Sequence, residues 1–374
     1  MIRHKQARHV STIAATVCLV VAGVAASGAR PALAAAPGND NLAGASVIGA
    51  LPFSTVVDMT DATIESGEPT PSSPGSGTID RSVWYDLTPV VSATYFASVG
   101  TFSCCWQPVL TVYTGSSVAT LTPTPTYTTS PQASFHADAG TTYHIQIGTT
   151  GSPFFGPPTV TFSIDVAPPP SVDFGEFTSD PSIFDTVQFF CQTYDPAGVG
   201  FRSWTWTFSD GTTATGCFPG PSRQWTSDRD VTVTLTATTV DGRSASTSHT
   251  VQVRTHDVSI AKLVVPTSAS VGQTRGISVG ISDTRYPETV QVQLLKSVPG
   301  QPYTSFQPVG SLTQSLNVNP ANKTTPFSFN YTFTAADGTA GKVTFEAIAT
   351  ILTGRDAQPA DNTVIALATT VNSR

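Results

Sequence analysis

The chain has 374 residues, a formal net charge of −7, and only 11% charged residues. An acidic chain with so few charges is a poor partner for nucleic acid or for anionic lipid, because phosphate groups attract basic surfaces. Threonine, serine, glycine and proline are abundant and no segment after residue 34 has the pattern of an amphipathic helix, so we predict an all-β protein.

The first 34 residues have the features of a secretory signal peptide. Three basic residues within the first eight precede an apolar run from residue 13 to residue 24, and residues 32–34 (Ala-Leu-Ala) match the small-x-small pattern of a cleavage site. The apolar run is too short to span a bilayer, which takes about 20 residues. We therefore expect a secreted mature chain without a transmembrane segment, released or held at the cell surface.

The mature chain is long enough for two or three domains of about 100–150 residues each. Short alternating apolar runs recur along it, and three consecutive prolines at 168–170 favour an extended linker. We divide it into module 1 (residues 37–167), module 2 (168–255) and module 3 (256–374). Each is predicted to be a β-sandwich, the first jelly-roll-like and the other two immunoglobulin-like.

Module 1 contains short predicted strands bounded by glycine, proline or asparagine, at residues 82–89, 109–115 and 139–148. Together with the segment 38–45, their order resembles the bacterial pre-peptidase C-terminal domain, a sandwich appended to secreted proteases and collagenases. The resemblance implies a non-catalytic module. Some members of that family bind calcium or a fibrous substrate.

The calcium ligands of that family are acidic and amide side chains near the first segment and the following strand, and Asn39, Asp40 and Asp80 match such positions. The glutamates that often precede the Asn-Asp pair are replaced by Ala-Pro-Gly at residues 36–38. Calcium takes 6–8 oxygen ligands, and asparagine and aspartate are also ordinary turn residues. The resemblance thus implies a calcium site, and a plain turn is the alternative.

Module 2 contains the clearest strand of the chain. Trp204, Trp206 and Phe208 alternate with polar residues, and Asp210-Gly211 then supplies a tight turn. A second alternating run follows at 230–238, and the whole resembles a PKD domain, an immunoglobulin-like sandwich. Such domains serve as spacers or as protein and polysaccharide contacts outside the cell. The tryptophans could form a sugar-stacking face, but a place in the core is the commoner role.

Module 3 has further strand-like runs at 258–260, 290–295, 327–333 and 342–347. It is similar to bacterial cell-adhesion-related (CARDB-like) domains, which open on an aspartate followed by an apolar strand and end near Ala-Asp-Asn. The similarity lies in Asp257, Val258, Asp361 and Asn362.

Four cysteines follow the signal segment, and in an exported chain an even number indicates disulfides, with three pairings open to four cysteines. Cys191 and Cys217 flank the Trp206 strand within one module, so we predict that they pair with each other. Cys104 and Cys105 then form a vicinal disulfide, bond to a partner, or stay free.

No HExxH, GxSxG or Ser-x-x-Lys pattern stands in a suitable context, so we expect no enzyme and no required cofactor. The sequence predicts a secreted, bacterial-type, non-catalytic binding or adhesion protein that contacts extracellular polysaccharide, cell wall or matrix protein. A structural spacer or surface-layer component is the alternative. A further hypothesis is a secreted hydrolase with an unrecognised site, or the accessory region of such an enzyme.

Overall fold

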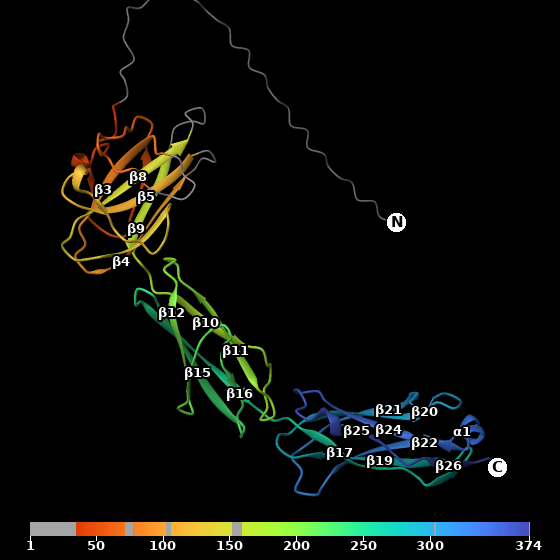
Figure 1. Ribbon diagram of the computed structural model, residues 1–374. Helices are drawn as coiled ribbons and strands as arrows, with labels where there is room; N and C mark the ends of the chain where they lie inside the picture. The colour runs from red at the N-terminus through yellow and green to blue at the C-terminus, as the bar shows by residue number, and fades with distance from the viewer. Residues whose placement is uncertain (1–34, 72–77, 102–105, 152–158, 303, 374) are drawn as a thin grey trace, which may run out of the picture.

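The computed structural model describes residues 35–71, 78–101, 106–151, 159–302 and 304–373. Within these residues the chain forms β-sandwiches that follow one another along an elongated molecule (Figure 1). Helix is confined in the described residues to α1 (Ala335–Ala340) and three 3₁₀ turns, η1 (Leu42–Gly44), η2 (Val118–Thr120) and η4 (Pro359–Asp361). The predicted all-β fold is confirmed.

Module 1 packs two sheets around an apolar core. The five-stranded sheet has the order β1 (Ser46–Val47), β3 (Arg81–Leu87), β8 (Tyr143–Gly151), β5 (Trp106–Thr114), β6 (Thr122–Pro123), and the four-stranded sheet has the order β2 (Phe53–Asp58), β9 (Thr159–Val166), β4 (Ala93–Thr101), β7 (Gln132–Ala137). Strand β9 shows the expected alternation, since Val160, Phe162 and Ile164 are buried and the residues between them are partly exposed.

The five-stranded sheet of module 1 is also covered on its outer face. In β3, Val83, Tyr85 and Leu87 face the main core, whereas Trp84 faces the other way and is equally buried. Trp84 packs there with Leu42 and Tyr113 in a small second cluster. The turns η1 and η2 therefore cover part of this outer face and form walls beside it.

Module 2 is a sandwich of a three-stranded and a four-stranded sheet. Their orders are β10 (Ser171–Glu176), β11 (Val187–Tyr194), β14 (Ser222–Arg223), and β13 (Thr213–Thr215), β12 (Phe201–Phe208), β15 (Arg229–Thr239), β16 (Ser244–Val253). Trp206 and Phe208 of β12 are buried against Phe174 and Phe189 of the opposite sheet. The turn predicted at Asp210-Gly211 is present, with Gly211 at a φ of 85°.

Module 3 contains three sheets around one core. Their orders are β17 (Val258–Val264), β19 (Thr274–Asp283), β22 (Thr325–Thr332); β18 (Ser268–Ser270), β26 (Thr369–Asn372), β23 (Lys342–Val343); and β21 (Phe306–Ser315), β20 (Thr289–Ser297), β24 (Phe345–Ile351), β25 (Thr363–Ile365). Phe327, Phe333 and Phe345 lie at the centre of this core.

Hydrogen bonds join the modules end to end. Between modules 1 and 2, the Ser134 hydroxyl donates to the carbonyl of Ala197. Between modules 2 and 3, the backbone N–H of Arg355 donates to Asp180 Oδ2 at 3.0 Å, and Tyr286 OH donates to Asp228 Oδ2 at 3.0 Å. The connections are thus supported by side chains as well as by the covalent chain.

Candidate functional site

The residues of the predicted calcium site have protein partners in the structure. Asn39 Nδ2 donates to the carbonyl of Trp84 at 3.0 Å, and both carboxylate oxygens of Asp40 accept from Thr63, at 2.6 and 2.7 Å. Asp80 pairs with Arg81 at 3.2 Å. Among the described residues, no group of three or more His, Cys, Asp or Glu side chains could hold a metal ion. Calcium binding stays a prediction.

Asn39 also belongs to the packing of module 1. Burial raises the pKa of the Tyr85 phenol, and a hydrogen bond with the Asn39 side chain lowers it by a smaller amount. Asn39 and Asp40 are themselves largely buried. Their contacts tie the first segment of module 1 to β3 and to the segment that precedes it.

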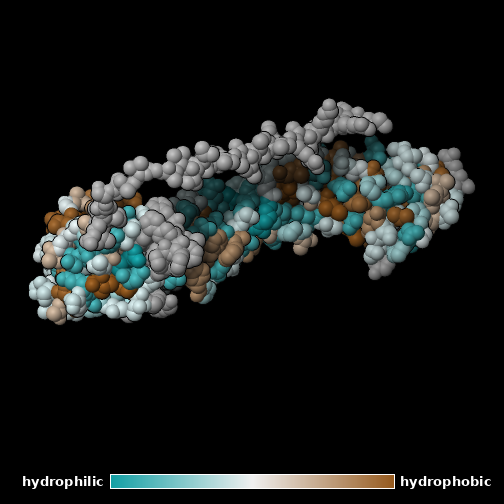
Figure 2. Space-filling view, turned by 90° about the horizontal axis from the view of Figure 1, so that it is seen from above, coloured by the Kyte–Doolittle hydropathy of each residue, from teal (hydrophilic) through white to brown (hydrophobic). Residues whose placement is uncertain are grey.

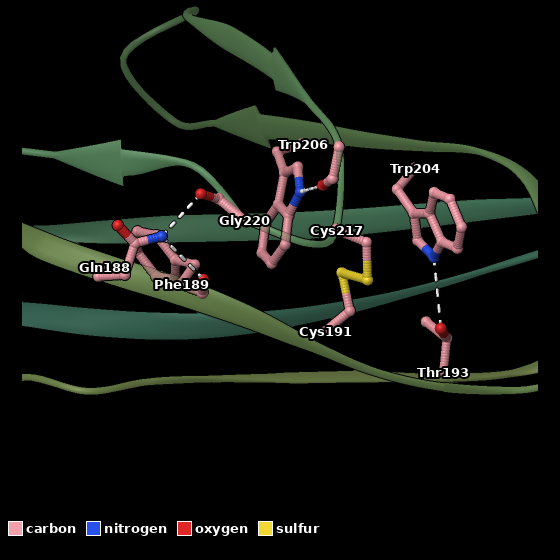
Figure 3. The surroundings of a disulfide bond; sticks show 9 residues. Gln188, Phe189, Cys191, Thr193, Trp204, Trp206, Cys217 and Gly220 are labelled. Carbon is pink, nitrogen blue, oxygen red and sulfur yellow. Dashed lines mark hydrogen bonds between the residues drawn. A yellow bond between two sulfur atoms is a disulfide. The ribbon is translucent and has the colours of Figure 1, made fainter.

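The structure contains the disulfide predicted between Cys191 and Cys217, which lies between Trp206 and Trp204 (Figure 3). Cys191 is on β11 and Cys217 lies in the segment between β13 and β14, so the bond ties this segment to β11 within the core of module 2. Cys104 and Cys105 lie outside the described residues.

The tryptophans of β12 belong to the core of module 2. Trp206 is fully buried, and its Nε1 donates to the carbonyl of Gly216 at 2.8 Å. Trp204 is partly buried against the same core, and its Nε1 approaches Thr193 Oγ1 at 3.3 Å (Figure 3). Trp206 therefore has the core role that was expected to be the commoner one, and Trp204 packs partly against the same core.

The opposite sheet of module 2 carries a different set of aromatic residues on its outer face. In β11, Val187, Phe189 and Cys191 point into the core, so Phe190 and Tyr194 point outward. Beyond the end of β10, Phe177 joins them, because its backbone N–H donates to the carbonyl of Gln188 and so continues the pairing with β11. We call Phe177, Phe190 and Tyr194 the aromatic face.

The aromatic face is solvent-exposed. Phe177 is 73% exposed and Tyr194 is 66% exposed, whereas Phe190 is partly buried. The rings of Phe177 and Phe190 lie 4.6 Å apart, centroid to centroid, at an angle of 35°. Phe190 and Tyr194 are four residues apart on one strand, so their Cα atoms are about 13 Å apart at ~3.3 Å per residue.

Gly175 makes room for the Phe190 ring. It pairs with Phe190 across β10 and β11, and a Cβ atom at position 175 would lie 2.5 Å from Cζ of that ring. The ring thus lies across the glycine and against the sheet. This close approach explains why a residue without a side chain stands opposite Phe190.

Two glutamines share the outward side of β11 with the aromatic face. Gln192 is exposed between Phe190 and Tyr194, and the Gln188 amide donates to the carbonyl of Gly220 at 2.6 Å. The carboxylate on the outward side of β10, Asp173, is within 3.0 Å of His249. Aromatic rings beside amides can bind a ligand that has both an apolar face and hydrogen-bonding edges.

Sequence reasoning missed the aromatic face. A signal was present, because Phe189 and Phe190 are consecutive in a strand and side chains alternate between its faces. One of the two rings therefore had to point away from the core. The position of Phe177 beside Phe190 could not be deduced in this way, since it depends on how β10 pairs with β11.

Each of the four described histidines lies beside a carboxylate. The pairs are His136 with Asp138 at 3.5 Å, His144 with Asp86 at 2.6 Å, His249 with Asp173 at 3.0 Å, and His256 with Glu288 at 2.5 Å. They lie in separate parts of the molecule, so they do not form a joint site. In the part of the chain that is described, no helix is long and apolar enough to cross a membrane.

Comparison with protein families identifies one part of the chain. Residues 168–255 match the family model of the PKD domain, and this is the span of module 2. The resemblance inferred for this module is thus confirmed. No curated protein matches the chain.

Some solved structures match the chain at low similarity. The fibronectin(III)-like modules of Clostridium thermocellum CbhA are 13% identical, with 54% of this chain and 95% of theirs covered and a TM-score of 0.30. A structure of promiscuous carbohydrate-binding modules from the β-sandwich superfamily is 15% identical, with 55% and 98% covered and a TM-score of 0.23. A bacterial ice-binding adhesin is 14% identical, with 78% and 91% covered and a TM-score of 0.23. At these scores the similarity carries no argument about function.

Proposed function

We propose that this chain is a secreted, non-catalytic binding and adhesion protein, and that it contacts neutral extracellular polysaccharide through the aromatic face of module 2. The observation that carries the proposal is the pair of neighbouring rings, Phe177 and Phe190, held at 4.6 Å on the outside of a sheet with Tyr194 along the same strand. Exposed aromatic residues that gather on one surface are typical of binding sites.

The chemistry of the aromatic face suits a sugar chain. The C–H groups on the flat side of a pyranose ring pack on an aromatic ring, while hydroxyl groups at its edges bond to amides such as Gln192. Low charge density and a net charge of −7 disfavour an anionic polymer. A cell-wall or matrix protein is the second class of partner that such a face can bind.

The PKD assignment of module 2 supports this proposal, since such domains act as spacers or as contacts outside the cell. We further propose that residues 1–34 direct secretion, that module 1 (37–167) is a pre-peptidase C-terminal-like domain, and that module 3 (256–374) is a CARDB-like domain. In this proposal modules 1 and 3 flank the module that carries the aromatic face.

A pull-down of the mature chain on insoluble cellulose, chitin, peptidoglycan and collagen tests the proposal. We expect retention on one of the polysaccharides, and a loss of about tenfold in affinity for Phe177→Ala or Tyr194→Ala, since one aromatic contact contributes about 0.5–1.5 kcal/mol beyond its buried area. The control is Phe184→Ala, a half-exposed phenylalanine of the same module. Equal retention of the wild type and the Phe177/Phe190/Tyr194 triple variant would overturn the proposal.

The same experiment separates the alternatives. Retention that is lost in chelator, and lost with Asp40→Asn, would support the calcium site inferred for module 1. Retention on collagen alone would identify a matrix-protein contact. No retention on any matrix would favour the structural spacer, a role that the elongated shape and the hydrogen-bonded junctions also suit. Turnover of a peptide or glycan substrate would favour the hydrolase.

A further inference from the structure

Module 1 has a polar pocket on the outer face of its five-stranded sheet, away from the aromatic face of module 2. The cavity has a volume of about 610 Å³, within the range of ligand pockets. Asp86 of β3 and His144 of β8 form its floor, and Glu65, Ser116 and Ser117 come from loops around it. Leu42 and Val118, from η1 and η2, add an apolar wall.

The floor of the pocket is held by a pair of neighbouring strands. Asp86 and His144 are directly opposite each other in the β3–β8 pairing, and Asp86 Oδ1 lies 2.6 Å from His144 Nδ1. On its other side, His144 Nε2 lies 3.0 Å from the carbonyl of Gly115. Both ring nitrogens thus face oxygen acceptors. The imidazole is held in one orientation, and neither nitrogen is directed at a serine hydroxyl of the pocket.

The loop that follows β5 is also held in place. The Thr120 hydroxyl accepts from the backbone N–H groups of Ser116 and Ser117, at 3.3 and 3.1 Å. Gly115 has a φ of 145°, and a Cβ atom there would lie 2.7 Å from the carbonyl oxygen of Thr120, so this tight loop requires glycine. The serines on the rim are therefore held in position before a ligand arrives.

The lining of the pocket is acidic. Of its two carboxylates, Asp86 is paired with His144, Glu65 has no ion-pair partner among the described residues, and no lysine or arginine contributes to the described lining. The backbone N–H of Leu42 donates to Glu65 Oε2 at 3.1 Å, which holds this carboxylate at the rim. Such a lining repels anions, and it offers acceptors to hydroxyl and ammonium groups.

We propose that this pocket binds a short saccharide that carries a free amine. The cavity has room for a sugar unit, the carboxylates and serine hydroxyls match its hydroxyl and ammonium groups, and Leu42 with Val118 can cover one flat side of its ring. The pocket and the aromatic face lie in different modules. Saccharide binding here is therefore independent of the function proposed for module 2.

The direct test is isothermal titration of the mature full-length chain with three trisaccharides. They are a glucosamine trimer, which carries amines, an N-acetylglucosamine trimer, which is neutral, and a galacturonic acid trimer, which is anionic. We expect binding in the order amine, neutral, anionic. Glu65→Gln should weaken binding of the glucosamine trimer about tenfold, as expected for the loss of one charge-assisted hydrogen bond.

Two further variants keep the test decisive if one substitution disturbs folding. Asp86→Asn removes the second carboxylate, and Ala119→Trp places a bulky side chain at an exposed position on the rim of the pocket. Both should weaken binding while the circular dichroism spectrum stays that of the wild type. The matched control is Asp138→Asn, whose carboxylate is exposed in the same module but outside the pocket.

The outcomes separate this site from the function proposed for module 2. Unchanged binding of the glucosamine trimer by Phe177→Ala, together with a loss in Glu65→Gln, would place the ligand in the module 1 pocket. No heat with any of the trimers would overturn the proposal. Equal affinity for the anionic trimer, or wild-type affinity in folded Glu65→Gln and Ala119→Trp, would also overturn it.

Discussion

Module 3 contains a buried carboxylate that should make its stability depend on pH. Asp283, at the end of β19, is fully buried. Neither of its carboxylate oxygens accepts a well-formed hydrogen bond from a donor in the described part of the chain. The backbone amides of Arg285 and Glu288 lie close enough to lower its pKa by a smaller amount. Burial, reinforced by the nearby charge of Glu288, raises the pKa of Asp283 to about 6. Burial, with Asp361 and Asp356 nearby, likewise raises the pKa of Asp257 to about 6.

The direction of the effect follows from the two protonation states. The ordinary pKa of an aspartate is 3.8, so between that value and about 6 the native state holds its proton while the unfolded state has lost it. The added stability is fully present below a pH of about 4, and it is lost as the pH rises through about 6. For Asp283 alone, the free energy of unfolding falls by about 1.4 kcal/mol between pH 5 and pH 7.5. Asp257 adds less, because it is partly exposed and solvent screens its charge.

The assay must report on module 3 by itself. All five tryptophans lie in modules 1 and 2, so tryptophan fluorescence does not report on module 3. Hydrogen exchange of peptides from β19, corrected for intrinsic rates at pH 5 and pH 7.5, measures its free energy of opening. Asp283→Asn should reduce the difference between the two pH values by about 1.4 kcal/mol.

The control for this experiment is Asp210→Asn, an exposed turn aspartate of module 2 whose pKa the Thr212 hydroxyl lowers. It should leave the pH response of module 3 unchanged. If Asp283→Asn leaves that response as large as in the wild type, the assignment of the effect to this buried carboxylate is wrong.

Three other substitutions each test one contact of the structure: the disulfide, the junction of modules 2 and 3, and the position of the Phe190 ring. Cys191→Ser should lower the stability of module 2 by about 3.5 kcal/mol in the chain-entropy model, given a separation of 26 residues between the cysteines, and should lower its tryptophan-detected melting temperature. Arg355→Ala removes the guanidinium contacts to the Asp180 carbonyl and to the Asp185 carboxylate, and should broaden the distribution of distances between modules 2 and 3 in small-angle scattering. Gly175→Val should displace the Phe190 ring and weaken retention on the bound matrix about as much as Phe190→Ala.

Each of these predictions has a result that contradicts it. An unchanged melting temperature for Cys191→Ser under oxidising conditions would show that the disulfide does not stabilise module 2. Scattering from Arg355→Ala that matches both the wild type and the exposed control Arg275→Ala would remove the role of this arginine at the junction. Full matrix retention by Gly175→Val would mean that the ring position does not matter for binding.

Local sequence pattern predicted much of the core of module 2. Trp206 and Phe208 alternate with threonines, and both side chains are buried. Alternation is reliable here because successive side chains of a strand point to opposite faces, so one buried residue sets the direction of its neighbours. The turn at Asp210-Gly211 has an equally local cause, because glycine adopts its positive φ without strain.

The pairing of Cys191 with Cys217 was also accessible to sequence reasoning. Both cysteines flank a strongly predicted strand within one module, and their Cα atoms lie 5.5 Å apart in the structure. Family resemblance predicted Asn39, Asp40 and Asp80 as calcium ligands. It could not show that the Asp40 carboxylate accepts two hydrogen bonds from Thr63, 23 residues further along the chain.

The sequence by itself thus determined the secondary structure class, the directions of side chains within strong strands, and the PKD character of module 2. Only the tertiary structure decided which outward residues meet. Phe177 lies beside Phe190 because β10 pairs with β11, and the module 1 pocket joins Glu65, Asp86 and His144 from segments far apart in the chain. Side-chain direction within a strand is a local property of the backbone, whereas neighbours across strands depend on strand pairing and register between distant segments.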